Sequence, residues 1–198
     1  MRVIGITGGV GAGKSALLSY IAEKYRCRIL MADEIAHKVK EPGQACYEEL
    51  VRLLSPEILN EDGTIHKGKM AAQIFESKDL LKKVNQLIHP AVKKMILDEI
   101  EAARAEGKTD FLFVEAALLI EDGYLDIVDE MWYIYAREEI RRGRLRESIN
   151  YSDEKIDEIM NSQLGEEDFR KYCSVVIDNS ESLPAAFHQI DRKLGEYL

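Results

Sequence analysis

The stretch GITGGVGAGKS, residues 5–15, sets the fold class that we expect for this 198-residue chain. Residues 8–15 match the pattern G-x-x-x-x-G-K-[ST], in which glycines let backbone N–H groups converge on a polyphosphate. Lys14 would neutralise β- and γ-phosphate oxygens, and the Ser15 hydroxyl would be a ligand of Mg²⁺. The alternative is a glycine-rich turn that caps an ordinary helix. The pattern favours a nucleoside triphosphate site whose members are Gly9, Val10, Gly11, Ala12, Gly13, Lys14, Ser15 and the adjoining Ala16.

The flanking residues supply the strand and the helix that this loop requires. Residues 2–7 are apolar and β-branched, as in a buried strand, and residues 15–24 carry apolar positions at helical spacing. Further strands are predicted at 27–31, 111–115, 130–135 and 174–177, and a last helix begins near Leu183. Strands that alternate with helices predict an α/β fold, a doubly wound parallel sheet of five strands flanked by helices.

The segment between the second and third strands has a different pattern. Residues 34–106 show almost no strand character, and helices are predicted at 46–54, 67–75, 79–88 and 91–105. The predicted breaks fall at Glu41-Pro42-Gly43, Ser55-Pro56, residues 60–63 and His89-Pro90, which carry turn residues. We therefore expect a helical insertion in the sheet domain.

Composition excludes several classes of protein. The chain is 46% hydrophobic and 32% charged, its formal net charge is −9, and its three cysteines are widely spaced. The negative charge opposes binding to nucleic acid or to an anionic membrane surface. The first residues lack the apolar length of a secretory signal, and the cysteine spacing fits no disulfide framework or metal knuckle, so we expect a cytoplasmic protein with buried thiols.

The loop does not by itself separate a kinase from an ATPase or a GTPase. The chain has no N-K-x-D motif for reading guanine, and it is short for a motor ATPase. A small kinase needs an acid near the acceptor, an acceptor pocket and a mobile cationic lid. The sequence offers candidates for all three.

The candidate acids follow two of the strands. Asp33 stands just past the second strand, where its carboxylate would accept the proton of an attacking hydroxyl, although an N-cap role for the next helix is an equal alternative. Glu115 ends the third strand and would order Mg²⁺ through water, with a salt-bridged strand end as the alternative.

The candidate lid is the basic run at residues 137–148. Arg142, Arg144 and Arg146 would close over the transferring phosphoryl group, or they would form a solvated basic helix face. His89, just before Pro90, would donate to a phosphate of the acceptor, but a structural role is more common for a lone histidine at a helix boundary.

Several stretches together resemble the dephospho-coenzyme A kinase family from end to end. Besides the loop, they are ADEIAHKV, EPGQACYEEL, LIHP, ALLIEDGY, GRLRES and VIDNSESL, in the family's order and approximate spacing. The resemblance implies ATP-dependent phosphorylation of the ribose 3′-hydroxyl of dephospho-CoA with Mg²⁺. It also implies one P-loop kinase domain with a core at about 1–33, 107–136 and 166–198, a helical CoA-binding region at about 34–106 and an arginine-rich lid at about 137–165.

The resemblance also assigns residues by position. Asp33 matches the acid near the acceptor hydroxyl, His89 the histidine of the substrate region, and Arg144 the first lid arginine. Asn179 lies in the segment near the adenine of ATP, and Leu118 lies in a substrate-binding stretch. The implied partner is dephospho-CoA alone, and the protein is expected to be a monomer or a weak homo-oligomer.

The chain also departs from the family pattern. Met31 replaces the first aspartate of D-A-D, Ala16 follows Ser15 in place of threonine, and Ser148 and Ile149 stand where the lid has its second arginine and an aspartate. Arg146 or Arg142 would have to supply the missing charge. A kinase of another nucleotide or small alcohol, and a degenerate homologue that binds ATP as a regulator, therefore stay open as alternatives.

Overall fold

The structure is a computed structural model that describes residues 1–75, 77–149 and 151–198, with the side chains of 148 and 149 outside that description. The chain divides into two compact units. Unit 1 comprises residues 1–29 and 103–198, and unit 2 comprises residues 30–102. Ser148 and Ile149, which replace an arginine and an aspartate of the family's lid pattern, therefore have side chains outside the described part of the structure.

A five-stranded sheet forms the centre of unit 1, although the last two residues of its second strand are counted with unit 2. Its strands are β1 (Arg2–Thr7), β2 (Cys27–Met31), β3 (Phe111–Glu115), β4 (Glu130–Tyr135) and β5 (Val175–Asp178), in the order β2-β3-β1-β4-β5. β1 pairs in parallel with β3 and β4, and β4 pairs in parallel with β5. The predicted α/β class with a five-stranded parallel sheet is confirmed, and the last strand begins and ends one residue later than predicted.

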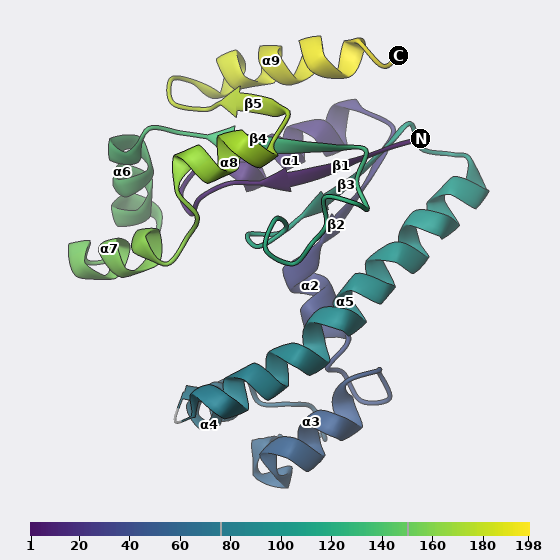
Figure 1. Cartoon of the computed structure of the whole chain (residues 1–198), viewed down its shortest axis with the longest axis vertical. Helices are drawn as coiled ribbons and strands as arrows, with labels where there is room; N and C mark the ends of the chain where they lie inside the picture. The colour runs from purple at the N-terminus through teal and green to yellow at the C-terminus, as the bar shows by residue number, and fades with distance from the viewer. Residues whose placement is uncertain (76, 150) are drawn as a thin grey trace. The chain divides into compact units, whose positions relative to one another are not determined.

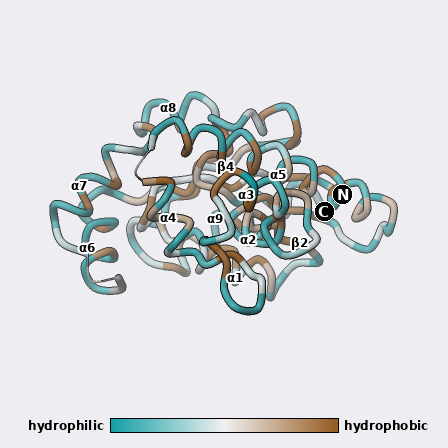
Figure 2. The backbone as a smooth tube through the Cα atoms, turned by 90° about the horizontal axis from the view of Figure 1, so that it is seen from below, coloured by the Kyte–Doolittle hydropathy of each residue, from teal (hydrophilic) through white to brown (hydrophobic). Residues whose placement is uncertain are grey.

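The helices of unit 1 are α1 (Lys14–Lys24), α6 (Glu138–Ile149), α7 (Asp153–Asn161), α8 (Glu166–Tyr172) and α9 (Leu183–Gly195). Figure 1 shows α9, in yellow, as the last element, beside β5. Along α6 and α7 the backbone is mostly hydrophilic, as Figure 2 shows, which fits helices with few buried positions.

The core of unit 1 is built from the central strands. Ile4 and Ile6 of β1 are almost fully buried, as are Phe113 and Trp132 on the neighbouring strands, whose rings meet edge to face with centroids 6.2 Å apart. Because β1 lies in the middle of the sheet with both faces covered, its carboxyl end lies where open α/β sheets bind ligands. The loop of residues 8–13 begins at that end.

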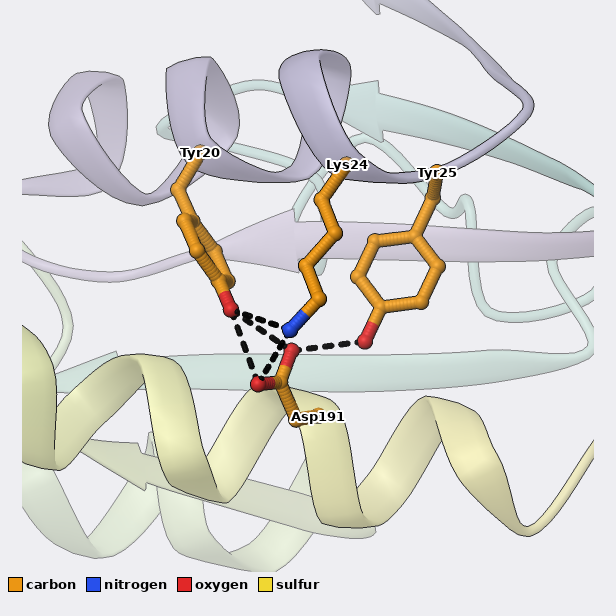
Figure 3. A network of polar contacts seen from close by, with 4 residues as sticks. All are labelled: Tyr20, Lys24, Tyr25 and Asp191. Atoms are coloured by element: carbon orange, nitrogen blue, oxygen red, sulfur yellow. Dashed lines mark hydrogen bonds and ion pairs between the residues drawn. The ribbon is translucent and has the colours of Figure 1, made fainter.

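A polar network joins α1 to α9 on the surface of unit 1 (Figure 3). The carboxylate of Asp191 accepts hydrogen bonds from the Tyr20 hydroxyl at 2.8 Å and the Tyr25 hydroxyl at 2.7 Å, and its Oδ2 lies 2.6 Å from Lys24 Nζ. The Tyr20 ring also stacks on Phe187 of α9. These contacts fix the C-terminal helix to the helix that follows the loop.

Unit 2 is helical, as the sequence predicts. It contains α2 (Ala32–Lys38), α3 (Tyr47–Leu54), the short 3-10 helix η1 (Pro56–Ile58), α4 (Lys67–Phe75) and most of α5 (Lys78–Glu106). Its core consists of apolar side chains that recur at helical spacing and are buried, among them Ile35, Leu50, Leu54, Ile58, Met70, Val92 and Ile96.

One predicted break in this region is wrong. Residues 78–106 form a single helix of 29 residues with Pro90 inside it, where two helices separated at His89-Pro90 were expected. An interior proline removes one backbone hydrogen bond and costs about 3 kcal/mol. Val84, Val92, Ile96 and Ile100 lie on the buried side of α5, both before and after Pro90, and their burial offsets that cost.

The three cysteines are free thiols, and Cys46 and Cys173 are buried as expected, whereas Cys27 is half-buried. Burial raises the pKa of Cys173 to about 12, so its thiol stays protonated. Within the part of the chain that the structure describes, every helix is too short or too polar to span a bilayer.

Candidate active site

The glycine loop adopts the conformation that the motif predicts. It leaves β1 at Thr7 and enters α1 at Lys14, with Gly11 at φ +77° and Gly13 at φ +88°. These values lie in the left-handed region, which residues with a Cβ rarely adopt. Gly13 is the N-cap of α1, and no side chain caps the helix there. The first turn of α1 therefore lies beside the loop with its N-terminus toward the site, in a position where the helix dipole favours negative charge.

The loop carbonyl groups are bonded to side chains from distant parts of unit 1. Arg141 Nε donates to the Val10 carbonyl oxygen at 2.9 Å. Arg144 Nη1 donates to the Ala12 oxygen at 3.1 Å, and Asn179 Nδ2 donates to the same oxygen at 2.8 Å. Buried carbonyl groups need donors, and N–H groups can converge on a ligand only when the opposing carbonyl groups are satisfied elsewhere. These three side chains thus hold the shape of the loop.

The same contacts explain why the loop is so rich in glycine. A Cβ built at Gly9 would collide with the guanidinium of Arg141, and one at Gly13 would collide with the Asn179 amide. At Gly11 a Cβ would lie 2.8 Å from the Arg141 carbonyl oxygen. Helix α6 and the residues after β5 approach the loop backbone too closely for any larger side chain.

Lys14 and Glu115 meet beside the loop. Lys14 Nζ donates to the Gly8 carbonyl oxygen at 2.8 Å and lies 3.6 Å from Glu115 Oε1. Glu115 ends β3, opposite Ile6 of β1 in the register, and its residue is 8% exposed. The parallel pairing of β1 and β3 therefore explains how residues 14 and 115 come together.

The loop is a local cationic site in an acidic protein. Lys14, Arg141 and Arg144 all contact loop carbonyl groups, whereas the chain as a whole carries a formal charge of −9. Burial lowers the pKa of Arg141, because removing a guanidinium from water disfavours its charged form. An anionic ligand at the loop would offset that cost.

The predicted lid arginines separate into two groups on α6. Arg144 lies on the loop, as described, and its Nη2 donates to the Asn179 carbonyl oxygen at 2.8 Å. Arg142 pairs with Glu138 and Asp157, and Arg146 pairs with Asp153, so both bind acidic residues of the 137–165 segment. The roles that the sequence predicts for Arg142 and Arg146 stay predictions.

Two residues at the loop were not singled out in the sequence. Arg141 lies three residues before Arg144, so helical spacing puts both on one face of α6, and that spacing could have identified it. Gln163 follows α7, and its Oε1 accepts from the Val10 N–H at 3.0 Å and from Arg141 Nη2 at 3.3 Å. No sequence signal marks Gln163, because its position depends on how α6 and α7 pack.

The candidate acceptor residues Asp33 and His89 belong to unit 2. Asp33 is exposed and lies in the first turn of α2, whose N-cap is Met31, so the alternative N-cap role does not hold. His89 is half-buried in the interior of α5 and lines an open hollow with Lys82 and Asn85, so it is not at a helix boundary.

Other predicted members of the site belong to unit 1. Leu118 lies in the turn after β3 and is 45% exposed. Asn179 is 1% exposed, and its Oδ1 is a buried acceptor that has no hydrogen-bond partner among the described residues. Ala16 lies in the first turn of α1 and is exposed.

The donors near the loop suit Mg²⁺ bound to a nucleotide. Among the described residues, no group of three or more His, Cys, Asp or Glu side chains is arranged to hold a metal ion by itself. Mg²⁺ usually takes one or two protein oxygens together with phosphate oxygens and water. Ser15 at the start of α1 and the carboxylate of Glu115 near Lys14 are oxygen donors of that kind.

Comparisons with known proteins agree with this architecture. The family model described as dephospho-CoA kinase matches residues 2–185. A protein of Streptococcus mutans named dephospho-CoA kinase is 33% identical over 195 residues, which cover 98% of this chain and 96% of the relative.

Two solved structures resemble the fold. TT1252 from Thermus thermophilus has a TM-score of 0.81 and 27% identity, covering 100% of this chain and 98% of the other. Dephospho-CoA kinase from Campylobacter jejuni has a TM-score of 0.74 and 22% identity, covering 98% and 96%. The match to the second structure supports the fold alone.

Proposed function

Because the chain belongs to the dephospho-CoA kinase family, we propose that it transfers the γ-phosphoryl group of ATP to the ribose 3′-hydroxyl of dephospho-CoA, giving CoA and ADP. Family membership makes it an ATP-dependent kinase that acts on an alcohol group. The observation that carries the proposal is the conformation of the loop of residues 8–15. Its carbonyl groups accept hydrogen bonds from Arg141, Arg144 and Asn179, and the Gly13 N-cap of α1 supplies no side-chain hydrogen bond to the helix N-terminus.

The donor side of the reaction follows from this loop. Backbone N–H groups of residues 9–16 would bind the phosphates, and the Val10 and Ala12 N–H groups would first leave Gln163 Oε1 and the Gly9 carbonyl oxygen. Lys14 would exchange its contact with the Gly8 carbonyl for the β- and γ-phosphate oxygens. Arg144 would balance the charge on the transferring group. The buried acceptor Oδ1 of Asn179 supports a place for that residue beside the nucleotide.

Mg²⁺ would be held by the Ser15 hydroxyl and, through water, by Glu115. When bound, it neutralises phosphate charge and orients the β- and γ-phosphates for in-line transfer. The ion pair with Lys14 supports this role for Glu115, because it keeps the carboxylate beside the group that meets the same phosphates.

On the acceptor side, Asp33 would accept the proton of the 3′-hydroxyl as its oxygen bonds to the γ-phosphorus and the bond from that phosphorus to the β,γ-bridging oxygen breaks. Exposure of Asp33 in the first turn of α2 supports this role, because the carboxylate can meet a ligand there. His89 and Leu118 would contact the acceptor. Arg142 and Arg146 would join the lid after leaving their ion pairs with acidic residues.

The enzyme would work in the cytoplasm on small molecules, as a monomer or a weak homo-oligomer, and its charge supports the absence of nucleic-acid and membrane partners. A net charge of −9 would repel anionic polymers and surfaces, whereas a small anion is met by the cations at the loop.

A coupled assay of ADP release, with and without dephospho-CoA, tests the function. Stimulation by dephospho-CoA, with CoA as the product, is the expected result. Stimulation only by another hydroxyl compound would assign the enzyme a different acceptor, and ATP binding without acceptor-dependent turnover would indicate a regulatory homologue.

The role of Asp33 is tested in the same assay. Asp33→Asn should lower kcat by about a hundredfold or more, as expected for loss of a general base, while ATP affinity stays within about twofold. Glu34→Gln, at the exposed neighbouring position of α2, is the matched control and should retain kcat. An unchanged kcat in Asp33→Asn would remove this residue from the mechanism.

A further inference from the structure

We propose that His37, Lys40 and Lys67 of unit 2 form a binding subsite for the diphosphate bridge of the acceptor. This inference rests on the proposed function for the identity of the acceptor, because dephospho-CoA carries a diphosphate between its ribose and its pantetheine.

The cavity that carries the proposal has a volume of about 280 Å³ and lies within unit 2. Three basic side chains line it from two directions, His37 and Lys40 from α2 and the turn after it, and Lys67 from the start of α4. Thr64 and Ile65 also line the cavity. Since liquid water occupies about 30 Å³ per molecule, the cavity has room for an anion of several heavy atoms.

Basic side chains outnumber acidic ones in the lining of this cavity, which favours the binding of an anion. Lys40 is half-buried, and burial together with the nearby charge of Lys67 lowers the pKa of Lys40, an effect that the Asp33 carboxylate partly opposes. Glu41 also lines the cavity and is exposed to solvent, as are His37 and Lys67. Like charges that face one another in a partly desolvated space are unfavourable, and a bound anion between them would reverse that effect.

The N-terminus of α4 adds positive electrostatic potential at the same cavity. Lys67 is the first residue of α4, a helix of nine residues, and Met70 of its first turn also lines the cavity. The N-terminus of a helix carries partial positive charge. The helix N-terminus and the lysine side chains therefore both attract an anion to this cavity.

The subsite lies along α2 from the proposed catalytic acid. Asp33 and His37 are four residues apart in α2 and therefore share one face, about 6 Å apart along the axis. Lys40 follows in the turn that ends the helix, where its N–H donates to the His37 carbonyl oxygen. In a nucleotide, the 3′-hydroxyl and the 5′-phosphate belong to one ribose, so an acceptor with its hydroxyl at Asp33 would carry its diphosphate toward His37 and Lys40.

Steady-state kinetics test the subsite. Lys40→Gln and Lys67→Gln should each raise KM for dephospho-CoA about tenfold or more, as expected for loss of a charge-assisted hydrogen bond, while kcat and KM for ATP stay within about twofold. Lys38→Gln, an exposed change on the same helix, is the matched control and should leave KM unchanged. The inhibition constant of adenosine, which has the ribose hydroxyl but no diphosphate, should be equal in all four proteins.

Calorimetry with inorganic pyrophosphate separates this inference from the proposed function. The titration is done with a non-hydrolysable ATP analogue saturating the loop, so that pyrophosphate reports on unit 2. If pyrophosphate binds the wild type but not Lys40→Gln or Lys67→Gln, the result supports the subsite. The subsite is supported in this way even if dephospho-CoA is not turned over, and in that case only the identity of the acceptor is overturned. Wild-type pyrophosphate affinity and wild-type KM in both variants, with unchanged thermal stability, would overturn the subsite.

Discussion

Single side chains decide whether the phosphate loop can keep its shape. Arg141, Arg144 and Asn179 donate to carbonyl groups of residues 10–12, and these donors come from α6 and from the end of β5. A buried carbonyl that loses its donor costs about 1–3 kcal/mol, and the loop can avoid that cost only by turning away from the ligand. Nucleotide affinity should therefore depend on residues that need not touch the nucleotide.

Arg141→Gln tests this dependence. The change removes the donor to the Val10 carbonyl, so we expect ATP affinity measured by calorimetry to fall about tenfold or more. Arg137→Gln removes an arginine of the same segment whose side chain is about half exposed and pairs with Glu139, and it should retain wild-type affinity. Equal affinities in the two variants would contradict the positioning role of Arg141.

Two glycines form a second matched pair. Gly13 has φ +88° and faces the Asn179 amide, so Gly13→Ala should destabilise the protein by roughly 1–3 kcal/mol and abolish ATP binding. Gly143 lies inside α6, and no neighbouring atom that the structure describes comes within 4 Å of the place its Cβ would take, so Gly143→Ala should stabilise the protein by about 0.5–1 kcal/mol. Chemical denaturation measures both, and a neutral Gly13→Ala would show that the loop tolerates another conformation.

The residues of the site differ in how far the sequence could predict them. The members of residues 9–16 were predictable because the motif is contiguous, and Glu115 because the ends of parallel strands meet at one edge. Arg141 lies beside a predicted residue on the same helix face, so spacing could have identified it. Gln163 could not be predicted, because its contact with Val10 spans 153 positions and depends on tertiary packing.

At the scale of elements, the contact between α1 and α9 depends on an ionised carboxylate (Figure 3). Partial burial of Asp191 disfavours its charge, but hydrogen bonds from Lys24, Tyr25 and Tyr20 outweigh that effect and lower its pKa to about 2. A carboxyl whose pKa is lower in the folded than in the unfolded state stabilises the fold above its ordinary pKa of about 3.9, and that stabilisation is lost as the pH falls through the folded value.

Asp191→Asn should therefore lower the free energy of unfolding at neutral pH by about 1–2 kcal/mol, the worth of the hydrogen bonds from the two tyrosines. The difference from the wild type should shrink as the pH is lowered from about 4 toward 2. Urea denaturation across this range measures it, with Glu23→Gln, an exposed change on α1, as the control. A difference that stays constant with pH would exclude a role for the charge of Asp191.

Helices and strands could be predicted where the local residue pattern favours the same structure as tertiary packing does. Residues 67–75 form α4 as predicted, and the third and fourth strands have the predicted bounds. The prediction failed at Pro90, where a local breaker lies inside a helix whose buried apolar side chains continue on both sides. A window of a few residues shows the proline, whereas the burial that offsets its cost depends on tertiary packing along the whole helix.

At the scale of the whole molecule, the distribution of charge should link ligand binding to stability. The cations at the loop in unit 1 lie in a protein with a net charge of −9, so Mg²⁺ and ATP should bind the folded state alone. Ligand at about one hundred times its Kd adds about 2.7 kcal/mol to the free energy of unfolding, which corresponds to roughly 5–10 °C in Tm for a chain of this length.

Differential scanning fluorimetry with and without Mg²⁺ and ATP tests this link. The wild type should show the full shift, and Lys14→Met should lose most of it because the ammonium beside the phosphates is removed. Lys155→Met is a suitable control, since Lys155 is exposed on α7 and pairs with Glu158. The same shift in wild type and Lys14→Met would place ATP away from the loop.

The long sequence separation between the loop and its donors has a consequence during synthesis. The glycine motif is complete at residue 15, but the arginine and asparagine that satisfy its carbonyl groups lie 131 and 167 positions after the residues to which they donate. Synthesis must therefore pass Asn179 before the nucleotide site can form. Nascent chains that stall before Asn179 should therefore not bind ATP.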